Sequence, residues 1–141
     1  MLVASTRLGD LDIDETTVLD FPDGLLGFGE SRRFALVDTH DTGVYFWLQS
    51  LDDSGLAFLT VAPWAFFPDY EPVLPEADRL ALGLEDVSDA LVLCLLTVDR
   101  ASTTITANLL GPLVINGATK VGRQVVLTDS GHSTRAPLAV G

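Results

Sequence analysis

Short strand-like segments separated by turn sequences dominate the chain. In GDLDID, Leu11 and Ile13 alternate with three aspartates, which is the period of two expected of a half-buried strand. Further strand-sized apolar segments include residues 3–7, 34–37, 44–51, 57–61, 90–98, 103–107, 113–115 and 121–127. Turns rich in glycine, asparagine and aspartate separate many of them. This spacing predicts an antiparallel arrangement of about eight or nine short strands.

Residues 62–84, APWAFFPDYEPVLPEADRLALGL, interrupt the strand pattern with four prolines and four aromatic residues. Proline cannot donate to a sheet ladder, so this segment is not a central strand. Within it, Pro75 to Leu82 has a proline near the first turn, early acidic residues and Gly83 just beyond its end, which predicts a short helix. A single helical turn is also expected at Glu30 to Arg33. The predicted fold is mainly β, antiparallel and barrel-like, closed or partly open, with one or two short helices.

Length and charge narrow the class of protein. With 141 residues the chain is expected to form a single domain, residues 1–141, and no apolar run reaches the roughly 18 residues of a membrane span. The net charge of −12 disfavours direct binding to nucleic acid and would attract a basic protein partner, although solubility alone also explains it. Cys94 is the sole cysteine, which excludes an internal disulfide and fits a reducing cytoplasm. No leader sequence is expected from the first residues.

Motifs for catalysis or cofactor binding are not recognisable in the sequence. DLDIDE fails the EF-hand pattern, because the sixth and twelfth positions counted from Asp10 hold Glu15 and Phe21. GLLGFG lacks the features of a phosphate-binding loop, and positive φ angles explain Gly24 and Gly27 better. We therefore expect no cofactor, no metal and no enzyme activity. The alternative is an enzyme or carbohydrate-binding barrel whose site is built from scattered carboxylates.

Five short motifs follow one another along the chain, and one of them is TANLLGPLVIN, residues 106–116. The other four are FPDGLLGF (residues 21–28), WLQS (47–50), WAFFPDY (64–70) and GRQVVLTD (122–129). The ordered set covers nearly the whole chain and resembles the FliW family of flagellar assembly factors. The chain departs from that pattern at Leu26, Gly111 and His132, where the family often carries proline, alanine and an aromatic residue.

The resemblance implies a non-enzymatic cytoplasmic regulator. FliW proteins bind flagellin, and when free of it they bind the RNA-binding regulator CsrA and relieve its repression of flagellin messenger RNA. A basic RNA-binding partner would suit an acidic chain, and amphipathic helices of flagellin would suit an exposed apolar surface. On this resemblance we expect flagellin and CsrA as protein partners, no direct contact with nucleic acid or membrane, and a monomer.

Two segments supply the candidate binding residues. In the proline-rich loop, Trp64, Phe67 and Tyr70 lie beside the acidic Asp69 and Glu71 and form either a partner hot spot or a cap on the core.

In TANLLGPLVIN, Asn108 can bond to backbone groups where strand pairing breaks. This segment is either a locked corner between strands, set by Gly111 and Pro112, or an edge at which Asn108 and Leu110 meet a partner.

Overall fold

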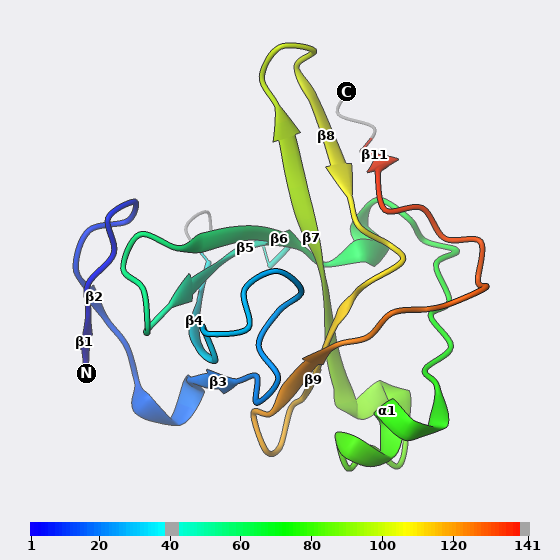
Figure 1. Ribbon diagram of the computed structural model, residues 1–141, viewed down its shortest axis with the longest axis horizontal. Helices are drawn as coiled ribbons and strands as arrows, with labels where there is room; N and C mark the ends of the chain where they lie inside the picture. Colours follow the sequence, from blue (N-terminus) through cyan, green and yellow to red (C-terminus); the bar gives the residue numbers. More distant parts are fainter. Residues whose placement is uncertain (39–42, 139–141) are drawn as a thin grey trace.

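The computed structural model describes residues 1–38 and 43–138 (Figure 1). The sequence folds into short strands with one α-helix, α1 (Glu76–Ala81), and the 3-10 helices η1 (Glu15–Thr17), η2 (Pro63–Ala65) and η3 (Val87–Asp89). The strands are β1 (Leu2–Val3), β2 (Leu11–Asp12), β3 (Leu19–Asp20), β4 (Arg33–Val37), β5 (Tyr45–Ser50), β6 (Ala57–Val61), β7 (Ala90–Asp99), β8 (Thr104–Ala107), β9 (Leu113–Asn116), β10 (Gly122–Gln124) and β11 (Ala136–Pro137).

The main sheet is antiparallel, as predicted. Its strands follow the order β10-β9-β7-β6-β5-β4-β3, with β8 paired to β7 and β11 paired to β8, while β1 and β2 form a separate pair. A single parallel bridge between Asp20 and Val121 links the ends of the main order. That bridge is not a strand ladder, so the sheet is open and the closed barrel that we considered is wrong.

Strand β7 lies between two clusters of buried side chains. Val92 and Cys94 belong to one cluster, which contains Tyr70 and is called here the Tyr70 core. Leu93, on the opposite face of the strand, belongs to the second cluster, the Phe34 core. Burying such aliphatic side chains stabilises the fold by about 1.5–3 kcal/mol each. Burial on both faces is confined to the middle of β7, because Leu91 and Val98 near its ends are exposed.

The helix predictions have mixed outcomes. Helix α1 lies within the predicted range, and Arg79 in its last turn donates to the Leu84 carbonyl at 2.9 Å. The helical turn expected at Glu30 to Arg33 is wrong, because Arg33 begins β4. The backbone N–H groups of Arg32 and Arg33 both donate to the Asp52 carboxylate, which holds this segment extended. His40 lies outside the described residues.

The first strand is shorter than predicted, because a buried polar contact replaces it after Val3. The Ser5 hydroxyl donates to Oε1 of Gln49 at 2.6 Å, and the Gln49 amide donates to nearby carbonyls, including that of Ser50 at 3.0 Å. Gln49 is therefore a fully buried structural residue at the end of β5.

Candidate functional site

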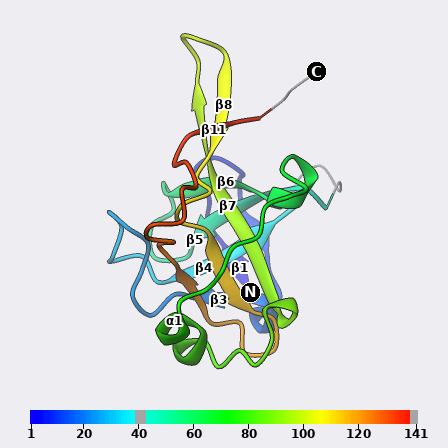
Figure 2. The same ribbon diagram turned by 90° about the vertical axis from the view of Figure 1, so that its right-hand side faces the viewer.

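Residues 62–75 run from β6 to α1 along the side of the molecule that Figure 2 faces. The segment is folded by its own backbone, since Phe67 N–H donates to Pro63 O at 2.8 Å and Tyr70 N–H donates to Phe67 O at 3.0 Å. The indole N–H of Trp64 donates to Tyr70 O at 2.8 Å. Although 43% of Trp64 is exposed, this bond fixes the orientation of its ring. A loop held this way presents its exposed groups with little conformational freedom to lose.

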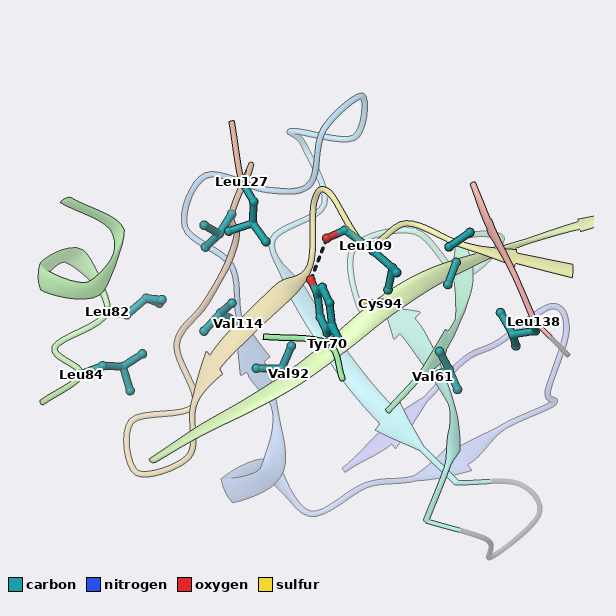
Figure 3. Packing of buried hydrophobic residues seen from close by; sticks show 13 residues of the cluster. Val61, Tyr70, Leu82, Leu84, Val92, Cys94, Leu109, Val114, Leu127 and Leu138 are labelled. Carbon is teal, nitrogen blue, oxygen red and sulfur yellow. Dashed lines mark hydrogen bonds between the residues drawn. The ribbon is translucent and has the colours of Figure 1, made fainter. Parts of the chain in front are cut away.

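Tyr70 joins this loop to the body of the protein. Its ring is buried, with 5% exposed, and its hydroxyl donates to the Leu109 carbonyl at 2.7 Å (Figure 3). Cys94 belongs to the same core and is fully buried. Burial raises the pKa of the Tyr70 phenol far above its usual range and that of the Cys94 thiol to about 12. Both groups are neutral at physiological pH, which makes Tyr70 a structural hydrogen-bond donor and Cys94 a small apolar core residue.

Leu109 belongs to a bulge between β8 and β9, two strands that pair with successive parts of β7. On β7, Leu96 pairs with Ala107 and Leu93 pairs with Leu113. These two pairs are three residues apart on β7 but six residues apart on the partner segment, so the partner segment has three extra residues that bulge out of the ladder. Such bulges end pairing and redirect the chain. The corner that we predicted in TANLLGPLVIN is therefore present.

Side-chain amides hold this bulge. Oδ1 of Asn108 accepts from the Gly111 N–H at 2.9 Å, and the Gln124 amide donates to the Gly111 carbonyl at 3.1 Å. A Cβ at Gly111 would lie 3.2 Å from Nε2 of Gln124, which is closer than ordinary contact. The structural role predicted for Asn108 is confirmed.

Residues 132–133 are a third segment that contacts the aromatic loop and the bulge, and sequence reasoning missed them. The Ser133 carbonyl accepts from the N–H groups of Leu109 and Leu110, at 2.9 and 3.2 Å. The His132 ring packs edge-on against Tyr70, with 4.8 Å between ring centroids. No local pattern marked this contact, because it depends on the fold bringing residues 62 positions apart together. A histidine in a polar turn gives no hint of a buried aromatic neighbour.

The structure thus brings the candidate residues to one region, the Tyr70 junction, formed by residues 64–71, 108–111 and 132–133. Trp64, Asp69 and Glu71 are exposed there, whereas Tyr70 is buried. The half-buried members are Phe67, Asn108 and Leu110. Phe67 and Leu110 pack against the Tyr70 core. The accessible chemistry of the region is that of an aromatic ring with carboxylates, while Tyr70 supports the surface from below.

The carboxylates with shifted pKa values lie elsewhere, at exposed turns. Hydrogen bonds from backbone N–H groups are the largest cause of the lowered pKa of Asp14 and of Asp52, and the Ser102 hydroxyl is the largest cause for Asp99. A general acid needs its pKa raised, so these shifts point the opposite way. Within the described residues, no group of three or more His, Cys, Asp or Glu side chains could hold a metal ion.

A second exposed apolar feature lies on residues 24–29. Leu26 is 66% exposed and Phe28 44% exposed. The loop is nevertheless fixed, because Leu26 N–H donates to Oε1 of Gln124 at 2.9 Å and the Phe28 ring packs against Phe58 at 5.0 Å. Gln124 therefore contacts both this loop and the bulge. The positive φ angles expected of Gly24 and Gly27 in this loop, 67° and 82°, are confirmed.

The fold and the junction define an open antiparallel β protein in which a proline-rich aromatic loop is locked onto a strand bulge. A family model described as FliW protein matches residues 2–138. The chain therefore belongs to the FliW family, and the resemblance seen in the sequence motifs is confirmed.

Similar proteins support this assignment. The flagellar assembly factor FliW of Leptospira interrogans serogroup Icterohaemorrhagiae is 37% identical over 134 residues, covering 94% of this chain and 89% of the relative. The protein of the same name from Treponema denticola is 37% identical over 135 residues, covering 96% and 91%. A crystal structure of the flagellar assembly factor FliW superposes with a TM-score of 0.87 at 33% identity, covering 97% of this chain and 96% of that one. In the described parts of the chain, no helix has the length and apolar character needed to span a membrane.

Proposed function

We propose that this chain is a flagellar assembly factor that binds flagellin and, when free of it, binds and antagonises the RNA-binding translational repressor CsrA. Binding CsrA would relieve repression of flagellin messenger RNA. The observation that carries the proposal is the family match over residues 2–138, because it covers the whole fold rather than one motif. The proposed location is the cytoplasm, where flagellin waits for export and messenger RNA is translated.

The Tyr70 junction is the proposed surface for flagellin. Its exposed Trp64 and half-buried Phe67 and Leu110 offer apolar area to an amphipathic helix, with Asn108 at the border. Aromatic residues contribute most at such interfaces because they bury much area with few rotatable bonds. The hydrogen bond from Trp64 to Tyr70 O orders the ring before binding, which lowers the entropy lost on association.

Charge is the proposed contribution to CsrA binding. The chain has 20 Asp and Glu residues against 8 Lys and Arg residues, and Asp69 and Glu71 place two of those acids at the Tyr70 junction. A basic protein would be steered to such a surface, whereas the phosphate backbone of RNA would be repelled. The chain would therefore act on the repressor and not on the messenger RNA itself.

The chemistry of the proposed function is binding alone. No step in it breaks a covalent bond, so it requires no cofactor, metal or enzyme activity, and the proposed regulator is a monomer without membrane contact. Hydrogen bonds from turn residues hold the carboxylates of Asp14, Asp52 and Asp99 and lower their pKa. A general acid needs its pKa raised, so these three groups favour the binding proposal over the carboxylate enzyme considered above.

Isothermal titration of the purified chain tests the proposal, with flagellin and CsrA from the same host as separate titrants. We expect both to bind and flagellin to prevent CsrA binding. Trp64→Ala should weaken at least one partner by about 2 kcal/mol, the scale of a hot-spot residue. Val73→Ala is the matched control, since Val73 is an exposed apolar residue in the same loop with 82% of its surface free. Absence of binding by either partner would remove that partner from the proposal.

A further inference from the structure

Strand β7 leaves its neighbour β6 after Leu95. Only the pairs Thr60–Leu95 and Val61–Cys94 join these two strands. Beyond this point β7 pairs with β8 alone, from Leu96–Ala107 to Asp99–Thr104. The two strands form a ribbon that projects from the body of the molecule, as both views show (Figures 1 and 2).

The two edges of this ribbon differ. The outer edge of β8 is covered by β11, through the pairs Ala136–Ala107 and Pro137–Thr106. The Leu138 N–H extends this cover by donating to Ile105 O at 2.9 Å. The outer edge of β7 at residues 96–99, called here the open edge, pairs with no strand in the described part of the chain.

Backbone alternation identifies which groups face the open edge. The Asn108 N–H donates to Leu95 O at 2.9 Å, so Leu95 directs its backbone toward β8. Successive residues of a strand point their backbone groups to opposite sides, so Thr97 and Asp99 also bond toward β8. Leu96 and Val98 consequently direct their N–H and C=O groups outward. An exposed row of such groups is a template for an added strand.

The charges beside the open edge differ from those of the whole chain. A hollow on one face of the ribbon is lined by Arg100 and Arg135, with the other lining residues Thr97, Val98, Asp99, Thr104 and Thr106. Neither arginine forms an ion pair within 4.0 Å in the described part of the chain. The Asp99 carboxylate is engaged by the Ala101 and Ser102 N–H groups at the ribbon's turn, at 3.0 and 3.4 Å. Arg135 acts electrostatically on Asp99, which lines the same hollow. With two arginines against one aspartate, the hollow still carries a positive charge that attracts an outside carboxylate in a chain of net charge −12.

We propose that the open edge of β7 takes up an extended acidic segment of a partner protein as an added strand. The partner backbone pairs with Leu96 and Val98, and its carboxylates reach Arg100 and Arg135. Side chains of an added strand alternate between the two faces of the ribbon. Acidic residues therefore belong at every second position, toward the hollow, and β-branched residues belong between them, beside Leu96 and Val98. This surface is separate from the Tyr70 junction and does not depend on the proposed function.

Titration with a defined peptide, followed by amide NMR of the full chain, tests the proposal. The probe is an end-capped octapeptide of alternating glutamate and threonine, and its matched control has lysine in place of glutamate. We expect the acidic peptide to shift the amides of residues 96–99 and to slow hydrogen exchange at Leu96 and Val98. The lysine peptide should bind at least about tenfold more weakly than the acidic peptide, which is the factor expected when charge-assisted hydrogen bonds are lost.

Two variants separate the backbone contribution from the charge contribution. Val98→Pro removes the outward N–H, and proline is tolerated at such an edge position, so peptide binding should be lost while the Thr97 and Asp99 amides remain protected by β8. Reversing both arginines, Arg100→Glu with Arg135→Glu, should weaken the acidic peptide by about tenfold. Arg32→Glu is the charge control, because Arg32 is exposed beside β4 and should leave peptide binding unchanged.

Three results would overturn the proposal. The first is equal binding of the lysine and glutamate peptides. The second is that the peptide shifts only amides outside the ribbon, and that the double arginine reversal and Val98→Pro bind the peptide as well as the unaltered chain does. The third is protection of Leu96 and Val98 that grows with protein concentration in the absence of peptide, because the occupant would then be a second copy of this chain. If Val98→Pro disrupts the ribbon, the arginine reversals and the two peptides still decide the outcome.

Discussion

The hydroxyl of Tyr70 should contribute measurably to stability, because it is the side-chain link between the aromatic loop and the bulge. Tyr70→Phe keeps the ring and removes only the hydroxyl, which donates to Leu109 O at 2.7 Å. Both residues are buried, with 5% and 8% exposed, so the carbonyl loses its partner in a site with little access to water. Leaving a buried acceptor unpaired costs about 1–3 kcal/mol. The free energy of unfolding should fall by that amount.

Urea denaturation followed by tryptophan fluorescence measures the change. Tyr45→Phe is the matched control, since Tyr45 is half-buried and its hydroxyl has no hydrogen bond within the described chain. That variant should change stability by less than about 0.5 kcal/mol. If Tyr70→Phe were as stable as the unaltered protein, or if both variants lost the same stability, the hydroxyl would not lock the loop to the bulge.

Three further predictions concern the second loop, acid stability and partner encounter. Gly24→Ala should lower the free energy of unfolding by about 2–4 kcal/mol in urea denaturation, because Gly24 has φ +67° and an added Cβ would lie 2.5 Å from Gly29 Cα. Gly27→Ala is the control: Gly27 has φ +82° but its added Cβ would meet open space, so the loss should be only about 1–2 kcal/mol. Backbone N–H groups hold the pKa of Asp52 below its ordinary value of 3.8 in the folded protein. The charged carboxylate therefore stabilises the fold fully above pH 3.8, and this stabilisation is lost as the pH falls through the lowered pKa of the folded state. Asp52→Asn should make stability fall less steeply at acid pH in a stability–pH profile. The association rate with CsrA should fall about tenfold between roughly 0.05 and 0.5 M salt in stopped-flow measurements, and a salt-independent rate would reject charge steering.

Local sequence patterns were sufficient for most of the strands and for α1. Residues 57–61 are apolar between turn signals, and the prediction for them agrees with β6. Pro75 and Gly83 mark the ends of the helix because one lacks an N–H group and the other accepts φ +66°. These signals depend only on neighbouring residues, so a single sequence contains them.

Long-range pairing was beyond the reach of those patterns. The open sheet depends on where β7 leaves β6, and no residue near Leu95 marks that point. Burial of Gln49 depends on Ser5, which is 44 positions away. Only the fold brings these two residues together, so a polar residue in a strand was equally compatible with exposure.

The candidate site was predicted in part. Aromatic and acidic residues in WAFFPDY identified the loop, but the sequence did not separate exposed Trp64 from buried Tyr70. That difference arises from contacts of Tyr70 with Leu109 and His132, which come from distant segments. The β7 open edge was also missed, since β7 and β8 look like an ordinary hairpin in the sequence.

The most direct measurement of the central claim is a reconstituted translation assay with flagellin messenger RNA and CsrA. The account predicts that CsrA represses synthesis, that adding this chain restores it, and that adding excess flagellin returns the system to repression. Trp64→Ala should alter the response of at least one step at equal concentration of folded protein. Repression that persists at saturating amounts of the chain would contradict the account.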